Sequence, residues 1–529
     1  MKLRKIFFLG LFTMPLLNVF AQKIIWQKNY GGDQSDYLRR IVPTPDYGFL
    51  VAGSSLSKIA GSNNGGLDYT LTKMNEDGDV EWEKSFGGHG NDMLSTVHLT
   101  MDGGMILGGD SNSGIGGLKS QDNIGFSDLW ILKLNASGDV EWEKTFGGIG
   151  TEKLVSIMQT KDKGYIIGAV SDSEPVEINS KLVGHKSEKS FGGFDFWIVK
   201  INSSGDVEWE KTIGGNGYDY LVNCFETNLG HFLIGGYSNS PLSGNKSVKL
   251  KGEGDYLLVE LDKNGTIIDE RNFGGKGNNE LTSFSKSNGG YIFGGRSNSK
   301  KSEDKSTDSK DYDFWIVKTD ELGKILWDRT FDIGKFDVLL DAIEDKNGDI
   351  VVSGYAQTES QDNVEDKDKI NNYSLIYLDN KGNEKLRKDI GGSKTDILNN
   401  TILTRDQSII MAGTSNSNKG GDKTINSNGR NDFWILKIGN PIINSSEERH
   451  KIEIYPNPTE RFVNVISDNE LKGSDINVIS VGGQLLQNFQ IKSTTAVIDL
   501  AGYPQGIYLI SIISDSGVIT KKILKTGAK

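Results

Sequence analysis

The sequence predicts an all-β protein, a seven-bladed β-propeller closed by its N- and C-terminal strands and followed by a small C-terminal β-sandwich. Two observations predict the propeller. All nine tryptophans occupy two positions of one recurring motif, Asp-Phe-Trp-Ile-Val-Lys, a turn, and Gly-Asp-Val-Glu-Trp-Glu-Lys-Thr-Phe-Gly-Gly. The chain of 529 residues also contains 66 glycines and is only 36% hydrophobic, which suits short strands joined by tight turns.

The motif recurs at a nearly constant spacing. Asp269 and Leu386 replace the first tryptophan in two of the seven repeats, and the repeat starts lie 56, 60, 67, 60, 58 and 59 residues apart. A period of this size indicates stacked supersecondary units. The first position is filled by Trp26, Trp82, Trp142, Trp209 and Trp327, and the second by Trp130, Trp197, Trp315 and Trp434.

One repeat reads as four strands. In the second unit we expect strands at residues 93–100, 105–109, 129–134 and 139–146. Turn signals at 102–104 and 136–138 separate two of the strand pairs. Four antiparallel strands in a unit of this length make one propeller blade.

The two ends of the repeat region complement each other. The repeats begin with a lone fourth strand at residues 24–30 and end with a lone third strand at 433–438. The N-terminal strand is therefore expected to complete the last blade. This closure removes exposed strand edges, which would otherwise invite aggregation.

The repeated tryptophans are expected to be core residues. Val80, Trp82 and Phe86 alternate along the fourth strand, so we expect them on one face, in the wedge between neighbouring blades. The alternative is that the indole rings stack on sugars.

Two rings of acidic residues repeat with the blades. The first ring lies four residues after each glycine pair and the second opens the third strand, so both rings are expected on one face of the propeller. We interpret both as acceptors for backbone N–H groups of their own turns. The alternative role for the first ring is calcium binding, because carboxylates around a channel attract cations. Its members are Asp36, Asp92, Glu152, Asp219, Asn279, Asp337 and Asp396, and all of them except Asn279 are candidate ligands. The second ring is Asp68, Asp128, Asp195, Asp255, Asp313, Asn372 and Asp432.

The loops before the third strands differ from one unit to the next. The loop at 173–194 is the longest and contains His185, while Lys246, Lys249 and Lys251 make another loop basic. Because these loops share a face with the acidic rings, that face is the default binding surface, unless the loops are merely solvated. The sixth unit departs from the repeat, with Asp332-Ile333 in place of the glycine pair, which we interpret as drift.

Catalytic signatures are absent from the sequence. The five histidines lack metal-ligand spacing, and no Gly-x-Ser-x-Gly elbow, phosphate loop or His-Glu-x-x-His occurs. Cys224 is the single cysteine and lies in an apolar strand, where we expect a small buried hydrophobe. The formal net charge of −12 disfavours nucleic acid and anionic membrane as partners.

The N-terminus has the pattern of a signal peptide, predicted at residues 1–21. Three basic residues precede an apolar run that ends in Val-Phe-Ala, and the run is too short to cross a membrane. We predict a propeller at residues 22–440, a linker at 441–451 and a separate domain at 452–529.

Two family resemblances follow from these motifs. Residues 23–440 resemble the seven-bladed repeats of secreted bacterial proteins often called SBBP repeats, through Asp-x-Trp-x-x-Lys and the Gly-Gly pair. The turn and tryptophan are also similar to the docking motif of quinoprotein dehydrogenases, whose characteristic cysteine pair is missing here. Sialidase Asp-boxes do not match.

The C-terminal segment resembles the type A sorting domain of the type IX (Por) secretion system of Bacteroidetes. Its landmarks appear in order and read as six or seven short strands. The resemblance implies passage across the outer membrane through the secretion machinery, removal of the domain, and either release or attachment to surface lipopolysaccharide. The landmarks are Tyr455, Pro456, Asn457, Pro458, Gly506, Ile507, Tyr508, Lys521 and Lys522.

Together these features predict a secreted or cell-surface binding or adhesion module. A glycan or protein is the expected ligand, no cofactor is expected beyond possible calcium, and a monomer is expected. The alternative is a secreted hydrolase or lyase that acts on polysaccharide or peptide at the propeller channel. A structural surface-layer role is the third hypothesis.

Overall fold

The computed structural model describes residues 24–44, 48–57, 65–334, 336–358, 370–404, 407–439, 452–466, 473–480, 483–493, 495–514 and 517–527. Only strands, turns and loops occur in these ranges, so the all-β prediction is confirmed. Within the same ranges, no helix is long and apolar enough to cross a membrane. The predicted signal peptide and linker lie outside the described residues.

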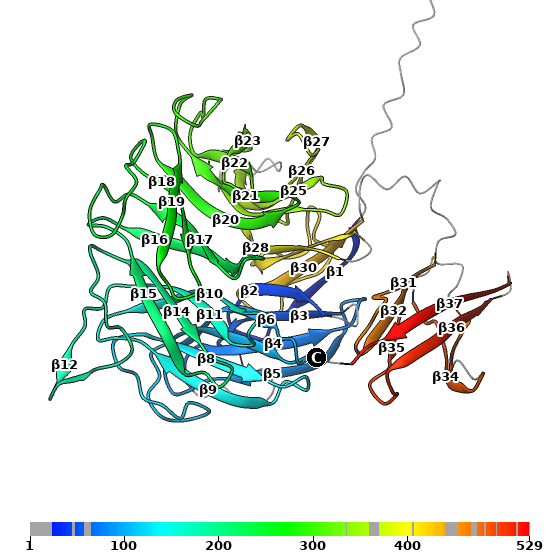
Figure 1. Cartoon of the computed structure of the whole chain (residues 1–529). Coiled ribbons are helices and arrows are strands. Elements are labelled where there is room, and N and C mark those ends of the chain that lie inside the picture. Colours follow the sequence, from blue (N-terminus) through cyan, green and yellow to red (C-terminus); the bar gives the residue numbers. More distant parts are fainter. Residues whose placement is uncertain are drawn as a thin grey trace, which may run out of the picture.

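The residues from Ile24 to Ile438 form seven four-stranded antiparallel sheets, which Figure 1 shows side by side. Apart from the last sheet, the strands of each sheet follow one another in space as they do in sequence, and we number the sheets in chain order. Sheet one contains β2 (Asp36–Pro43), β3 (Phe49–Ser55), β4 (Asp68–Met74) and β5 (Val80–Phe86). Sheet two contains β6 (Asp92–Leu99), β7 (Met105–Ser111), β8 (Asp128–Leu134) and β9 (Val140–Phe146). Sheet three contains β10 (Glu152–Gln159), β11 (Tyr165–Ser171), β14 (Asp195–Ile201) and β15 (Val207–Ile213).

The remaining sheets repeat this arrangement. Sheet four contains β16 (Asp219–Glu226), β17 (Phe232–Ser238), β18 (Asp255–Leu261) and β19 (Ile267–Phe273). Sheet five contains β20 (Asn279–Ser287), β21 (Gly290–Ser297), β22 (Asp313–Asp320) and β23 (Ile325–Phe331). Sheet six contains β24 (Asp337–Glu344), β25 (Ile350–Thr358), β26 (Ile370–Leu378) and β27 (Glu384–Ile390). Sheet seven contains β28 (Asp396–Leu403), β29 (Ile409–Ser415), β30 (Asp432–Ile438) and the N-terminal β1 (Ile24–Tyr30). A short hairpin, β12 (Glu177–Ile178) and β13 (Lys181–Leu182), lies in the long loop of sheet three.

The first strand of each sheet lies innermost. It contacts the first strands of the sheets before and after it, and β2 contacts β28 of the last sheet. The outermost strand of the last sheet is β1, which pairs antiparallel with β30 over Ile24 to Tyr30. The first strand and the last strand of the repeat region therefore share one sheet.

Every innermost strand carries a β-bulge at the same place. The register shifts between Leu38 and Arg40 in β2, and the same shift occurs at the third residue of the other six strands. A bulge leaves one residue unpaired and redirects the neighbouring side chains. Here it sets the side chains that line the centre of the molecule.

The core lies between successive sheets, and the third-strand tryptophans fill it. Trp130, Trp197, Trp315 and Trp434 are all fully buried. Trp130 packs on Tyr69 of the preceding sheet, with ring centroids 5.1 Å apart. The core-packing prediction is confirmed for these four residues.

The fourth-strand tryptophans behave differently from the prediction. Trp82 is half-buried and Val80 is 41% exposed, whereas Phe86 is 4% exposed. The expectation that all three share one buried face is therefore wrong. The physical reason is that the fourth strand forms the outer edge of its sheet, and a register shift separates Val80 from Trp82.

The C-terminal segment folds as two facing sheets. One contains β31 (Glu453–Tyr455), β32 (Phe462–Ile466) and β35 (Thr495–Asp499). The other contains β33 (Asp475–Ser480), β34 (Leu485–Gln490), β36 (Gly506–Ser514) and β37 (Gly517–Lys525). Val463 and Ile498 of one sheet share a single buried cluster with Ile476 and Ile510 of the other, as the predicted β-sandwich requires.

Candidate functional site

The first acidic ring is buried and hydrogen-bonded. Asp92 is representative, because its Oδ2 accepts bonds from Gly88 N–H at 2.7 Å and from Ser113 Oγ at 2.9 Å. Its acidic equivalents accept in the same way from the second glycine of the pair, or from Ile333 N–H in sheet six. Asn279 of sheet five instead donates from its Nδ2 to Gly275 O at 3.2 Å. The interpretation of these carboxylates as acceptors for backbone N–H groups is confirmed. Calcium binding by the ring remains a prediction.

The second ring faces the first ring across each sheet junction. Asp195 of sheet three and Asp219 of sheet four both lie against Gly214, the first glycine of the pair between them. Burial raises the pKa of Asp195 to about 7, against the lowering effect of the Phe191 N–H, and the Asp219 charge raises it further. The junctions at Gly31, Gly147 and Gly274 likewise place two acidic or amide side chains around a glycine that has no room for a Cβ.

One junction contains a third carboxylate. Where the other junctions have a glycine, this junction has Asp332, and its carboxylate lies with those of Asp313 and Asp337 so that the oxygens are within 4.8 Å of one another. The pKa of Asp337 is raised to about 6, mainly by burial. Its backbone hydrogen bonds oppose this rise, and the nearby charges of Asp313 and Asp332 add to it. Of the groups found in the described residues, this cluster has the oxygen-rich chemistry that a hard cation prefers.

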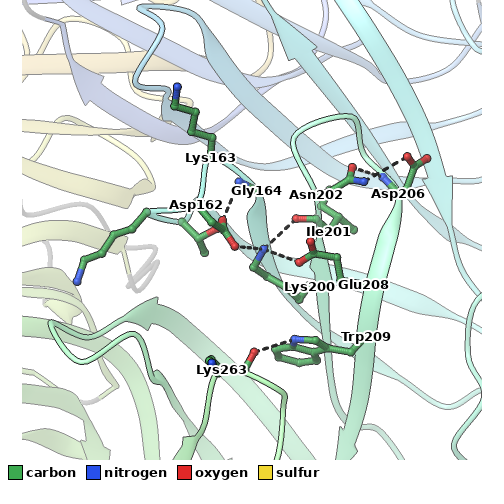
Figure 2. A network of polar contacts seen from close by, with 12 residues as sticks. Asp162, Lys163, Gly164, Lys200, Ile201, Asn202, Asp206, Glu208, Trp209 and Lys263 are labelled. Carbon is green, nitrogen blue, oxygen red and sulfur yellow. Dashed lines mark hydrogen bonds and ion pairs between the residues drawn. The ribbon is translucent and has the colours of Figure 1, made fainter. Parts of the chain in front are cut away.

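The half-buried tryptophans contact the next sheet. Trp209 lies against the turn that joins the third and fourth strands of sheet four, and its Nε1 donates to Lys263 O at 3.1 Å (Figure 2). A Cβ added at Gly265 in that turn would lie 2.8 Å from the indole ring. The pairs Trp26–Gly78, Trp82–Gly138, Trp142–Gly205 and Trp327–Gly382 repeat this contact. These rings hold neighbouring sheets together, and this accounts for their recurrence without a ligand.

The motif lysines are also internal. Lys200 Nζ bonds Asp162 and Glu208, each at 2.9 Å, and donates to Ile201 O at 3.2 Å (Figure 2). Lys133 repeats the arrangement with Asp102 at 2.9 Å and Glu141 at 2.7 Å. The lysine side chains are only 4% exposed, so they are no part of a binding surface.

Five of the long loops are each anchored by a buried lysine of their own. Lys119 Nζ donates to Ser111 Oγ at 3.0 Å and to Ser113 O at 2.7 Å, and Lys246 makes the equivalent bonds to Ser238 and Ser240. The interpretation of Lys246 as part of a basic loop surface is therefore wrong, because the ammonium is needed inside the loop. The anchoring lysines are Lys119, Lys186, Lys246, Lys305 and Lys423.

Cys224 is buried and His185 is half-buried. Cys224 is 0% exposed, and burial raises the pKa of its thiol to about 12, which confirms the small buried hydrophobe. His185 packs edge-on against Phe146 with ring centroids 5.1 Å apart. Burial lowers the pKa of His185, and Lys144 lowers it further, so the imidazole is neutral near pH 7.

Exposed apolar side chains gather in the loops of sheets two to four. Phe126 is 81% exposed, and its N–H donates to Gly150 O at 2.8 Å, beside the exposed Ile149. Tyr218 and Tyr220 are 49% and 40% exposed, and their rings are nearly parallel with centroids 6.0 Å apart. We call this set the apolar loop surface; it comprises Ile115, Leu118, Phe126, Ile149, Ile178, Leu182, Tyr218, Tyr220 and Leu242.

A cavity of about 310 Å³ lies among the innermost strands of sheets one to six. Its lining includes Arg40, His98, Asn223, Lys286 and Asp341, all in the second half of their strands, away from the long loops. Burial, together with the Arg40 charge, lowers the pKa of His98 to about 3. We call this space the channel cavity. Sequence reasoning missed these residues. Arg40, Asn223 and Asp341 stand at the bulge position, and His98 and Lys286 lie further along their strands.

The sorting-domain landmarks converge on the edge of the sandwich. Asn457 Nδ2 donates to Lys522 O at 2.8 Å and its Oδ1 accepts from Leu524 N–H at 2.9 Å, so the opening segment is fixed to β37. A groove of about 320 Å³ brings together Tyr455, Asn457, Lys521 and Lys522. Gly506, Ile507 and Tyr508 lie on the adjacent β36, and Tyr508 is part of the core. No polar contact for the side chain of Lys521 or Lys522 is found in the described residues.

These features define a class: an all-β repeat protein of propeller-like architecture with a C-terminal β-sandwich. Residues 453–526 match the family described as the secretion system C-terminal sorting domain. The chain therefore carries the sorting domain of the type IX secretion system and is exported to the cell surface or released. No curated protein matches the chain in sequence.

Several solved structures are similar in fold. PorZ of Porphyromonas gingivalis, a surface component of the type IX secretion system, is 10% identical over 94% of this chain, with a TM-score of 0.38. The chain spans 60% of the length of PorZ. The WD40 domain of Pan2 from Neurospora crassa is 9% identical, with a TM-score of 0.41. The match covers 76% of this chain and 89% of the Pan2 domain. A puromycin hydrolase is 10% identical over 83% of this chain and 60% of its own, with a TM-score of 0.43.

Proposed function

We propose that this exported protein is a non-catalytic binding module that recognises an extracellular polymer or protein through the apolar loop surface. The observation that carries the proposal is the exposure of large side chains on structured loops, above all Phe126 at 81% and Ile115 at 65%. Large exposed apolar side chains that lie near one another, as Tyr218 and Tyr220 do, favour an interaction site because leaving them in water is unfavourable.

The repeated chemistry supports this location. The tryptophans, the motif lysines and the acidic rings all have partners within the fold, which leaves the irregular loops as the variable surface. The described loops between β21 and β22 and between β29 and β30 carry none of the large exposed apolar side chains. Among the described long loops, those of sheets two to four therefore carry the large exposed apolar side chains.

The loops are also ordered before any ligand arrives. Lys119 and Lys186 lie buried beneath two of the loops that carry the surface and bond their backbone. Pre-organised loops bind with a smaller loss of conformational entropy. Tyr218 packs on Gly193 of the neighbouring loop, which fixes one ring of the stacked pair. Flat aromatic faces held in place suit sugar rings or apolar protein side chains.

Two experiments test this proposal: binding of the mature protein to a glycan array, and a pull-down with the mature protein from outer-membrane and medium fractions. We expect a ligand whose binding falls at least tenfold in Phe126→Ser and Tyr218→Ser. The matched control is Leu322→Ser, which removes a 75% exposed leucine from the turn between β22 and β23. An equal loss of binding in the control variant, or unchanged binding in both loop variants, would argue against this surface. Turnover of a polysaccharide or peptide would overturn the non-catalytic assignment.

A further inference from the structure

Arg40 is the exception in the ring of side chains at the bulges. The six other positions are Thr96, Ser156, Asn223, Ser283, Asp341 and Asn400. Several of these serve the backbone of a neighbouring strand. Ser283 Oγ accepts from Ala342 N–H at 3.0 Å, and Asn400 Oδ1 accepts from Ile41 N–H at 3.1 Å. Arg40 has no such role, and its Nε is buried without a hydrogen-bond partner among the described residues.

The carboxylate of Asp341, which lines the same cavity, is already engaged. Asp341 Oδ2 accepts from Thr401 N–H at 2.7 Å, and its oxygens also accept from Asn400 Nδ2 at 3.2 and 3.3 Å. Burial raises the pKa of Asp341 and the Arg40 charge opposes that rise, whereas burial and the Arg40 charge both lower the pKa of His98. Arg40 forms no ion pair with Asp341 in the described part of the chain. Arg40 is half-buried, and a buried N–H donor such as its Nε costs free energy when it has no acceptor. Such a group is retained where it has another use.

The channel cavity has the chemistry to supply that use. The guanidinium fork matches a carboxylate geometrically, with two parallel N–H donors. Ser156, Asn223 and Thr282 add hydroxyl and amide groups, while Met158 and Phe225 form an apolar wall. A cavity of about 310 Å³ holds on the order of ten waters, or one molecule the size of a sugar acid.

Charge favours an anion over a neutral ligand. The lining contains the cations Arg40 and Lys286 and one carboxylate, that of Asp341. Lys286 Nζ donates to Glu226 O at 2.8 Å and lies 4.7 Å from the centroid of the Phe225 ring. It therefore holds a fixed position on the wall, and Arg40 is the free donor.

We propose that the channel cavity is a binding site for a small carboxylate-bearing molecule and that Arg40 is the residue that holds its carboxylate. The site is separate from the apolar loop surface. It does not depend on the polymer or protein proposed there, and failure of one proposal leaves the other standing.

Thermal unfolding of the mature protein with D-glucuronate, L-glutamate and D-glucose at 10 mM tests the site. We expect at least one of the two carboxylates to raise the midpoint of unfolding, because a ligand that binds only the folded state stabilises it, while glucose at the same concentration has no effect. Arg40→Gln should abolish that rise. Arg39→Gln is the matched control, since Arg39 is the adjacent, exposed arginine of the same strand and should leave the rise unchanged.

A second measurement separates binding from a structural role. Without added carboxylate, Arg40→Gln should unfold at the same temperature as the wild type or higher, because the variant removes a half-buried charge whose Nε has no acceptor among the described residues. A marked fall in this midpoint would show that Arg40 supports the fold, and would overturn the proposal. So would the absence of a rise with both carboxylates, or a rise that persists in Arg40→Gln.

Discussion

Trp209 and Gly265 belong to neighbouring sheets, and the indole ring of the first covers the Cα of the second. Gly265 has a φ of 83°, and a Cβ at this position would lie 2.8 Å from the ring. The tryptophan and the glycine of the repeated motif are thus two halves of one contact between sheets.

Replacing Gly265 with alanine tests this contact. The methyl group adds left-handed backbone strain of about 1–2 kcal/mol and a clash of about 1–3 kcal/mol with the indole ring. Gly103→Ala is the control, because Gly103 has a similar φ of 82° with nothing within 4 Å of the added Cβ. Urea unfolding should give a larger loss of stability for Gly265→Ala; equal losses would argue that the ring contact contributes nothing.

The first glycine of each pair is a second site of close approach. A Cβ at Gly147 would overlap the buried Oδ1 of Asp128, so we expect Gly147→Ala to lower the free energy of unfolding by about 1–3 kcal/mol. In a double-mutant cycle with Asp128→Ala, the alanine at 147 should cost less than it does alone. Additive losses would mean that the carboxylate is not the group that excludes a side chain.

The paired carboxylates predict a stability that falls as pH rises. Burial raises the pKa of Asp195 from 3.8 to about 7, so the folded state holds a proton that the unfolded state releases above pH 4. The contribution of Asp195 is fully present below pH 3.8 and is lost as pH rises through about 7. Asp195→Asn should therefore raise stability at pH 8 by about 1–3 kcal/mol and have little effect at pH 4.

Asparagine is a fair replacement because Asn372 occupies the equivalent position in sheet six. Chemical denaturation at pH 4, 6 and 8 gives the required free energies. A variant that is less stable than the wild type at pH 8 would show that the ionised carboxylate stabilises the junction.

Removing metal is expected to change little. The first-ring carboxylates already accept backbone hydrogen bonds, so we expect the same midpoint of thermal unfolding in EDTA as in 5 mM calcium chloride. A higher midpoint in calcium that disappears in Asp332→Gly would instead assign calcium to the Asp313, Asp332 and Asp337 cluster. Asp332→Gly restores the residue found at the other junctions.

Several elements could be predicted because they depend on local sequence. The apolar run at 129–134 predicts a strand, and the structure places it at Asp128–Leu134 in the third position of sheet two. The buried third-strand tryptophans and Cys224 follow from the same apolar patterns. The acceptor role of the acidic rings follows from the turn that each residue begins.

Other features were beyond local reasoning. The alternation of apolar residues along the fourth strand predicts that Trp82 is buried. Its actual burial depends on the hairpin of the next sheet, about 55 residues away. Lys246 reads as a surface charge, yet its ammonium lies inside the loop and bonds Ser238 and Ser240. Arg40 carries no motif at all. Its significance appears only when the first strands of six sheets surround one cavity.

The sequence by itself determined the all-β class, the repeat and its glycine turns, and the sorting domain, because period, turn residues and motif order are written locally along the chain. Tertiary structure alone decided which charges are neutralised and which remain free. Pairing depends on side chains brought together from different strands, as with Lys200 and Asp162. It leaves Arg40 without a partner in the channel cavity among the described residues, and Phe126 exposed on the loops.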